Sequence, residues 1–311
     1  MGFACLVIPG FECRLQSARW CGMRVGLFPG QGVQPSIVLD ALSSRHSLLK
    51  RADEILEMDL RRRVEIASRG PAGALPTWLA QPAIFVSSMI GWEAAASDDI
   101  GFFAGHSLGE YAALVAAGAL EFDDALRTVR SRGVAMQDAS RQAPGGMAAV
   151  LGLSLTNAAE IADQAGIAVA NDNAPGQVVL SGSTAGLTKA AGMVVAAGGR
   201  SVLLDVGGAF HTSAMVPAVE PFRRALELCD FKLPGTPVIS NVTARPYGSI
   251  EEIRNLLLEQ LTGSVRFRES LEWLWAKGVR EYQDFGPGQV VAGLCKRTFR
   301  ALETSRAAVY A

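Results

Sequence analysis

The sequence is poor in metal-binding side chains and in excess charge of either sign. Its 311 residues include only three histidines and five cysteines, and the formal net charge at pH 7 is −1. A net charge so close to zero argues against a general nucleic-acid-binding protein. No apolar stretch is long enough to cross a membrane as a helix. We therefore expect neither a nucleic-acid partner nor a membrane partner.

The five cysteines do not form a metal-binding pattern. They are Cys5, Cys13, Cys21, Cys229 and Cys295. The spacing of the first three matches no zinc site, and an odd number of cysteines without a secretion signal indicates reduced thiols in the cytoplasm. No basic residue precedes the first apolar patch, which makes a poor signal peptide. Two interpretations of residues 1–22 stay open, a disordered N-terminal extension or a start codon placed too far upstream.

The composition is that of an enzyme-sized globular protein in which strands and helices alternate. Hydrophobic residues make up 49% and charged residues 19% of the chain, enough for a large core in one or two domains. Apolar runs at 24–28 and 100–104 predict strands. Gln81-Pro82 predicts the start of a helix that reaches about Ala96, and another helix is predicted from about Phe122 to Ser140. The fold class is therefore α/β.

The pattern changes after Pro144, where a smaller unit is predicted. Strand, helix, strand, strand, helix and strand are expected in turn at 147–153, 155–166, 167–172, 177–182, 185–199 and 200–206. This β-α-β-β-α-β order is the ferredoxin-like signature. We predict a large α/β domain at 23–144 and 208–311, a ferredoxin-like subdomain inserted at 145–207, and an active site in the cleft between them.

The stretch GHSLGEYAAL, residues 105–114, places Ser107 between two glycines. A predicted strand precedes it and apolar residues at helical spacing follow it, which is the context of a nucleophile elbow. Glycine allows the tight turn, and the start of a helix offers N–H groups to a developing oxyanion. The alternative is a glycine-rich turn that needs small residues only for packing. The flanking segments favour the nucleophile.

Three histidines are candidates for the base that would activate Ser107. His106 adjoins the serine, so its side chain should point away from the hydroxyl and pack beneath the turn or contact substrate. His46 lies among basic residues on a predicted solvated helix. His211 follows an apolar strand and a Gly-Gly break, at a strand end where catalytic residues often lie. A structural histidine is the competing interpretation, and elimination favours His211 as the base.

From residue 23 onward the sequence resembles the malonyl-CoA:acyl carrier protein transacylases, the acyltransferase family of fatty acid and polyketide synthesis. The matching stretches are FPGQGVQ (28–34), QPAIF (81–85), GHSLGEYAALVAAG (105–118), RGVAMQ (132–137), NAPGQVVLSG (173–182), AFHTSAM (209–215), ISNVTARP (239–246), LEQL (258–261) and FGPGQVVAGL (285–294). Each is weak alone, but all of them in order are specific. The resemblance implies a hydrolase-like large domain with a parallel sheet, no cofactor and a cytoplasmic enzyme, which we expect to be a monomer.

The resemblance also implies the reaction and the residues that carry it. Malonyl would pass from malonyl-CoA to Ser107 and then to the phosphopantetheine thiol of an acyl carrier protein, in a ping-pong reaction. His211 would move the proton, held by the main-chain carbonyl of Gln260. Backbone N–H groups of Gln31 and Leu108 would form the oxyanion hole.

Substrate binding is assigned by the same resemblance. Arg132 would pair with the free carboxylate of malonyl through two parallel hydrogen bonds, which lysine cannot match. His106 and Met136 would line the substrate site. Phe210, directly before His211, goes with malonyl rather than methylmalonyl in related acyltransferases, because a phenyl ring fills the space that an α-methyl group needs.

Two other functions agree less well with these residues. An acyl hydrolase of the same fold would gain nothing from a carboxylate clamp at Arg132, and a non-catalytic docking module would not need Ser107 and His211. A Ser-His-acid triad has only Asp172 and Asp205 as candidate acids. Between Arg254 and Arg300 the chain has eight basic and five acidic residues. A docking surface for an acidic carrier protein is one interpretation of this excess, and ordinary solvated helix faces are the other.

Overall fold

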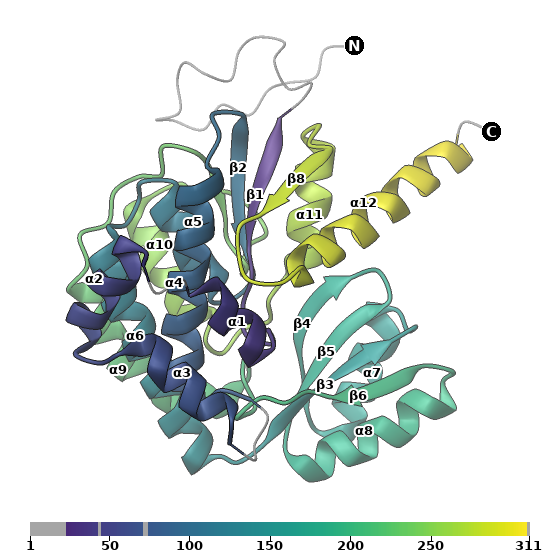
Figure 1. Cartoon of the computed structure of the whole chain (residues 1–311). Coiled ribbons are helices and arrows are strands. Elements are labelled where there is room, and N and C mark those ends of the chain that lie inside the picture. Colours follow the sequence, from purple (N-terminus) through teal and green to yellow (C-terminus); the bar gives the residue numbers. More distant parts are fainter. Residues whose placement is uncertain (1–22, 43–44, 71–73, 310–311) are drawn as a thin grey trace.

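A computed structural model describes residues 23–42, 45–70 and 74–309, which form two sheets flanked by helices (Figure 1). The predicted extension at residues 1–22 lies outside the described residues. In the large domain a four-stranded sheet has the order β7-β2-β1-β8, and all its pairings are parallel. Its strands are β1 (Arg24–Phe28), β2 (Ile100–Gly105), β7 (Val238–Ile239) and β8 (Glu281–Asp284). The parallel sheet agrees with the predicted α/β class.

Both faces of the large sheet are covered, because successive side chains of a strand point to opposite faces. Val25, Leu27 and Phe102 pack on one face with residues of α11 (Phe267–Ala276) and α12 (Val290–Val309). Phe28 and Phe103 join the cluster on the other face. That cluster includes residues of α2 (Ser47–Leu56), α3 (Leu60–Ser68), α4 (Thr77–Ala95), α5 (Gly109–Ala116), α6 (Phe122–Gln142), α9 (Val216–Glu227) and α10 (Ile250–Glu259).

The predicted start of helix α4 is wrong by a full turn. The helix begins at Thr77, and Pro82 lies inside it. A proline there removes the hydrogen bond to the carbonyl four residues earlier. The helix is buried along most of its length, so tertiary packing outweighs that lost bond. Gly133 of α6 allows the close approach, because a Cβ at that position would lie 2.9 Å from the Thr77 carbonyl oxygen.

The smaller unit is an antiparallel sheet with the order β4-β5-β3-β6, covered on one face by two helices. Its elements are β3 (Gly146–Leu151), α7 (Leu155–Ala165), β4 (Ala168–Ala174), β5 (Gln177–Gly182), α8 (Thr184–Ala196) and β6 (Arg200–Leu203). This is the ferredoxin-like arrangement. The last strand ends at Leu203, earlier than predicted, because the chain then turns into the active-site cavity.

Strand β4 connects the small unit to the large domain. Asn171 forms a parallel bridge with Val265, and the Asp172 N–H donates to the Val265 carbonyl at 2.9 Å. Arg268 of α11 pairs with the Asp172 carboxylate at 2.9 Å. The two units therefore meet along β4, beside the cleft. None of the helices in the described ranges is long and apolar enough to cross a membrane.

Candidate active site

Ser107 lies on a sharp turn between β2 and α5. Its φ is 50°, in the left-handed region that non-glycine residues seldom adopt. A Cβ on Gly105 would lie 2.0 Å from the backbone of Gly109, and a Cβ on Gly109 would lie 2.1 Å from the Phe28 carbonyl oxygen. Both glycines are therefore required by close backbone approach. The Ser107 N–H donates to Oδ1 of Asn241 at 2.6 Å, which fixes the turn.

His211 faces the serine from the junction after β6. Its Nδ1–H donates to the main-chain carbonyl of Gln260 at 2.7 Å, so Nε2 carries the lone pair. The Ser107 hydroxyl lies 2.9 Å from that Nε2 and donates to it. Burial, and then the positive charge of Arg132, lower the pKa of His211 to about 3. The imidazole is therefore neutral and placed to accept the serine proton.

Neither candidate acid of a triad contacts His211. Asp172 is bound to Arg268, with its two oxygens 3.0 Å from the Nε of that guanidinium. Asp205 is exposed at the mouth of the cavity. Since Nδ1 of His211 is already bound to a carbonyl, the geometry is that of a serine–histidine dyad.

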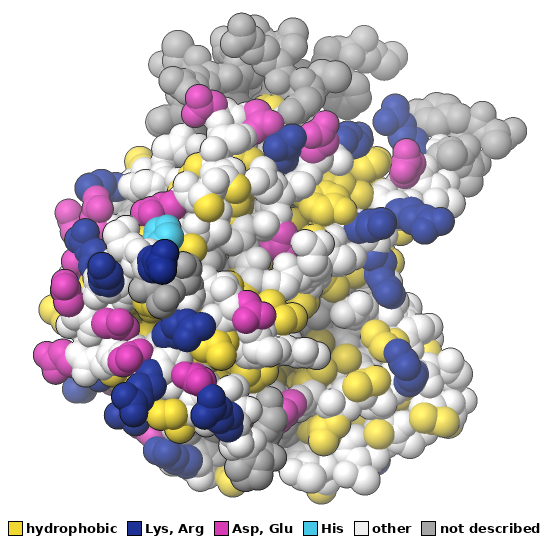
Figure 2. Space-filling model, in the orientation of Figure 1, with side chains coloured by type: hydrophobic (Ala, Val, Ile, Leu, Met, Phe, Trp, Pro, Cys, Tyr) yellow, Lys and Arg dark blue, Asp and Glu magenta, His cyan; other side chains and the backbone are white. Residues whose placement is uncertain are grey.

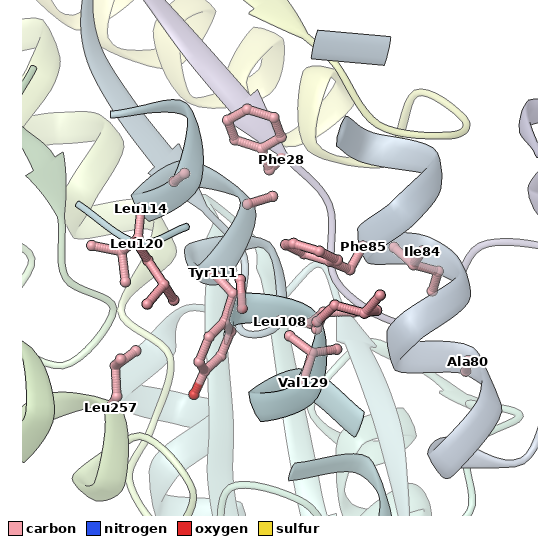
Figure 3. Close-up of a cluster of buried hydrophobic side chains, with 14 of the residues drawn as sticks. Phe28, Ala80, Ile84, Phe85, Leu108, Tyr111, Leu114, Leu120, Val129 and Leu257 are labelled. Atoms are coloured by element: carbon pink, nitrogen blue, oxygen red, sulfur yellow. The ribbon is translucent and has the colours of Figure 1, made fainter. Parts of the chain in front are cut away.

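Two backbone N–H groups near Ser107 are free to meet an oxyanion. Within the described ranges, no acceptor takes the N–H of Leu108 or of Gln31. The Leu108 side chain is buried in the cluster with Phe85 and Val129 (Figure 3), so its backbone is held in place. The Ser107 N–H cannot serve, because it is bound to Asn241. An oxyanion hole formed by Gln31 and Leu108 stays a prediction that this geometry supports.

Arg132 of α6 contacts Ser107 and is only 1% exposed. Its guanidinium donates to Ser107 Oγ at 3.0 Å, to Gln81 Oε1 at 2.9 Å and to Gln260 Oε1 at 2.9 Å. All three acceptors are neutral, and Nε finds no acceptor among the described residues. Burial lowers the pKa of Arg132. Among the described residues no carboxylate hydrogen-bonds to this guanidinium, so it can pair with the carboxylate of a ligand.

The remaining predicted residues line a cavity of about 250 Å³ above Ser107. Phe210 and Met136 belong to its wall, as do His106 and Gln31. His106 Nε2 lies 2.7 Å from Asn173 Oδ1, and burial lowers the pKa of that histidine. Across the part of the chain that the structure describes, no His, Cys, Asp and Glu side chains gather into a potential metal site.

Four polar residues of this site were not among the predicted site residues. They are Gln81, Glu110, Asn173 and Asn241, all buried. Gln81 links Arg132 to Gln31, since its Nε2 donates to Gln31 Oε1 at 3.2 Å. A usable signal was present for Glu110, a lone charged residue in the otherwise apolar run GEYAALVA. Gln81, Asn173 and Asn241 lie inside the matching stretches QPAIF, NAPGQVVLSG and ISNVTARP, but their contacts in the site are with residues distant in the chain.

Comparisons with known proteins agree with one another. A sequence model of the acyl transferase domain matches residues 65–310. The malonyl CoA-acyl carrier protein transacylase of Bacillus subtilis (strain 168) is 40% identical, over 89% of this chain and 91% of that protein. The acyl-carrier-protein S-malonyltransferase of Burkholderia pseudomallei 1710b superposes with a TM-score of 0.81 at 35% identity, over 89% of this chain and 93% of that one. A malonyl-transacylase solved in complex with a type II polyketide acyl carrier protein superposes with a TM-score of 0.80 at 32% sequence identity, over 89% of this chain and 93% of that one.

Proposed function

The chain belongs to the acyl transferase domain family, and from this premise we propose that it transfers malonyl from malonyl-CoA to the phosphopantetheine thiol of an acyl carrier protein. The product would serve fatty acid or polyketide synthesis. We place the reaction in the cytoplasm, where thiols stay reduced, which suits the free and buried Cys229 and Cys295.

In the first half-reaction Ser107 attacks the thioester carbonyl of malonyl-CoA. His211 Nε2 takes the hydroxyl proton as the C–O bond forms. The N–H groups of Gln31 and Leu108 stabilise the negative charge on the former carbonyl oxygen. The tetrahedral intermediate then expels the CoA sulfur, which leaves as a thiol with the proton from His211. The result is a malonyl ester on Ser107.

The second half-reaction reverses these steps with a different thiol. The carrier protein's phosphopantetheine thiol gives its proton to His211 and attacks the malonyl ester. Ser107 leaves as the alcohol, taking the same proton back from the histidine. No proton is gained or lost overall, so a single base suffices for both halves.

The observation that carries this proposal is the position of Arg132. Its guanidinium lies 3.0 Å from Ser107 Oγ, deeply buried, with only neutral hydrogen-bond acceptors. An acyl group on Ser107 that ends in a carboxylate would find its counter-charge there. Phe210 in the cavity wall would limit the space beside the α-carbon and so favour malonyl over methylmalonyl.

Arg132→Ala should therefore cut malonyl transfer steeply and leave acetyl transfer intact. Burying the malonyl carboxylate without its partner costs about 3–5 kcal/mol, whereas an acetyl group brings no charge. Rates of Ser107 acylation by malonyl-CoA and acetyl-CoA, followed by intact mass, give the comparison. Arg127→Ala, an exposed arginine on the same helix, is the control. Equal wild-type rates with the two donors would rule out the carboxylate clamp.

Basic side chains on α12 provide a surface for an acidic carrier protein. Figure 2 shows dark blue side chains along this helix, and Lys296, Arg297 and Arg300 are exposed on it. We expect the double variant Lys296→Glu, Arg297→Glu to raise the KM for the carrier protein while self-acylation by malonyl-CoA is unchanged. Two rim charges worth about 0.5–1 kcal/mol each correspond to roughly 5- to 30-fold.

The salt dependence of the second half-reaction supplies a further measurement. It should weaken in the double variant, because fewer complementary charges remain to be screened. Reversal of Arg223 and Arg224, two exposed arginines on α9, is the matched control. Unchanged carrier kinetics in the α12 variant would place the docking surface elsewhere.

A further inference from the structure

Glu110 is a buried carboxyl group that the steps above do not use. It lies in the first turn of α5, close behind the nucleophile, and is 1% exposed. Its oxygens accept hydrogen bonds from Gln260 Nε2 at 2.5 Å, from the Asn241 N–H at 3.3 and 3.4 Å, and from the Tyr247 hydroxyl. A carboxyl group placed in an apolar interior is costly. The free-energy cost of burying Glu110 therefore requires an explanation.

The side chain of Gln260 connects Glu110 to Arg132. Its Nε2 donates to Glu110 Oε2 and to the Ser107 carbonyl at 3.1 Å, while its Oε1 accepts from Arg132 at 2.9 Å. A carboxylate only accepts, and a guanidinium only donates. The Gln260 amide can therefore satisfy both neighbours in only one orientation, with its NH₂ group toward Glu110 and its oxygen toward Arg132. The main chain of Gln260 also holds His211, so the same residue joins Glu110 to both parts of the site.

The charges around Glu110 are few. Arg132 of α6 is the cation that acts on it, and the hydroxyls of Tyr247 and of Tyr111, on its own helix, face it with pKa values raised by burial. Gln260, after α10, and Asn241, after β7, present neutral amides. His211 lies beyond Gln260 and is neutral. Above pH 7 the free enzyme thus holds one buried carboxylate near one buried guanidinium.

A malonyl group changes this balance. Its carboxylate, bound at Arg132, would place two anions near a single cation among buried side chains. Like charges in such a site force one of the two groups to bind a proton. Burial raises the pKa of Glu110 to about 7, so protonation near neutral pH costs little. An acetyl group adds no anion and changes nothing.

We propose that Glu110 is a positioning residue for malonyl loading, which fixes the Gln260 amide against Arg132 and takes up one proton from solvent when the malonyl carboxylate binds. The proposal rests on the proposed function. The carboxylate of Glu110 becomes the neutral acid, the proton comes from water or buffer, and no covalent bond other than O–H is made. Above pH 7 Glu110 is mostly ionised in the free enzyme, so malonyl loading has to draw this proton from solvent. Malonyl loading therefore becomes less favourable as the pH rises.

The decisive measurement compares malonyl-CoA and acetyl-CoA on the wild-type enzyme. In a weakly buffered indicator solution at pH 8, loading with malonyl should take up close to one proton per enzyme more than loading with acetyl. Between pH 7 and 9 the KM for malonyl-CoA should rise roughly tenfold per pH unit, while that for acetyl-CoA should not. The released CoA is the same in both reactions, so its titration cancels.

Glu110→Gln places a neutral amide of the same shape at this position. We expect it to flatten the malonyl profile between pH 7 and 9 and to abolish the extra proton uptake, with Glu54→Gln, an exposed site on α2, as control. Parallel malonyl and acetyl profiles in wild type, with equal proton uptake, would overturn the proposal even if the variant does not fold. Absence of any malonyl adduct on wild type would instead overturn the proposed function, and this proposal with it.

Discussion

Ser107→Ala should abolish the malonyl-enzyme adduct, so that intact mass after incubation with malonyl-CoA shows only unmodified protein. The hydroxyl oxygen is the atom that forms the ester, and no second nucleophile faces His211 Nε2 among the described residues. Transfer to the carrier protein should stop as well, because ping-pong transfer requires the ester.

Two controls make this result specific. Ser213→Ala changes an exposed serine near the site and should label like wild type. A thermal melt of Ser107→Ala should stay close to wild type, since Arg132 keeps its bonds to Gln81 and Gln260. A persistent adduct in Ser107→Ala would mean that another residue is the nucleophile.

The elbow could be predicted from sequence because its causes are local. Strand, glycine, serine, glycine and helix follow one another within a few residues, and a Cβ on Gly105 would clash with the backbone of Gly109 in the same turn. The ferredoxin-like order was predictable for a similar reason, since its strands and helices carry their own apolar patterns. The parallel sheet was implied by the family resemblance, because the short strands β7 and β8 were not predicted from the apolar pattern. Those predictions agree with the structure.

The polar network beneath the serine could not be predicted in this way. Gln260 and Glu110 are 150 residues apart, and Ser107 and Asn241 are 134 apart. Nothing in the pattern around either partner encodes the other, because a hydrogen bond between side chains depends on tertiary structure alone. The family motifs pointed to Gln260 for its carbonyl. The hydrogen bonds of its side-chain amide with Arg132 and Glu110 are visible only in the structure.

At Pro82 the prediction was wrong for the opposite reason, because tertiary packing outweighs a strong local signal for a helix start. Proline favours the first turn of a helix, and the sequence offers no other start as clear. Burial of α4 against α6 nonetheless extends the helix back to Thr77, where Gly133 lets the two helices approach closely. That extension matters for the site, because it places Gln81 within reach of Arg132.

His211→Ala should slow acylation of Ser107 by roughly 10²–10⁴-fold, the usual contribution of a positioned general base. The serine then loses its proton acceptor, while Arg132 and the two free N–H groups stay in place. Single-turnover rates of adduct formation with malonyl-CoA measure the loss. Residual slow labelling is expected, since the oxyanion contacts do not depend on the histidine.

Asp172→Asn and Asp205→Asn separate a dyad from a triad. Neither carboxylate contacts His211, so each change should have a far smaller effect on acylation than His211→Ala. Asp172→Asn weakens the pair with Arg268, so its melting temperature should be checked alongside. A loss comparable to that of His211→Ala in either variant would favour a triad, and with it the hydrolase interpretation.

The pH dependence of acetyl loading tests the state of His211 without the charge of a malonyl group. An ordinary histidine with a pKa near 6.5 would be mostly protonated at pH 5, and the rate would fall about 30-fold from its value at pH 8. Burial and Arg132 lower the pKa of His211 to about 3, so the neutral base persists down to about pH 4. We therefore expect acetyl loading to change little between pH 8 and pH 5. A fall centred near pH 6.5 in both the wild type and Glu110→Gln would show that the histidine is solvated in the working enzyme.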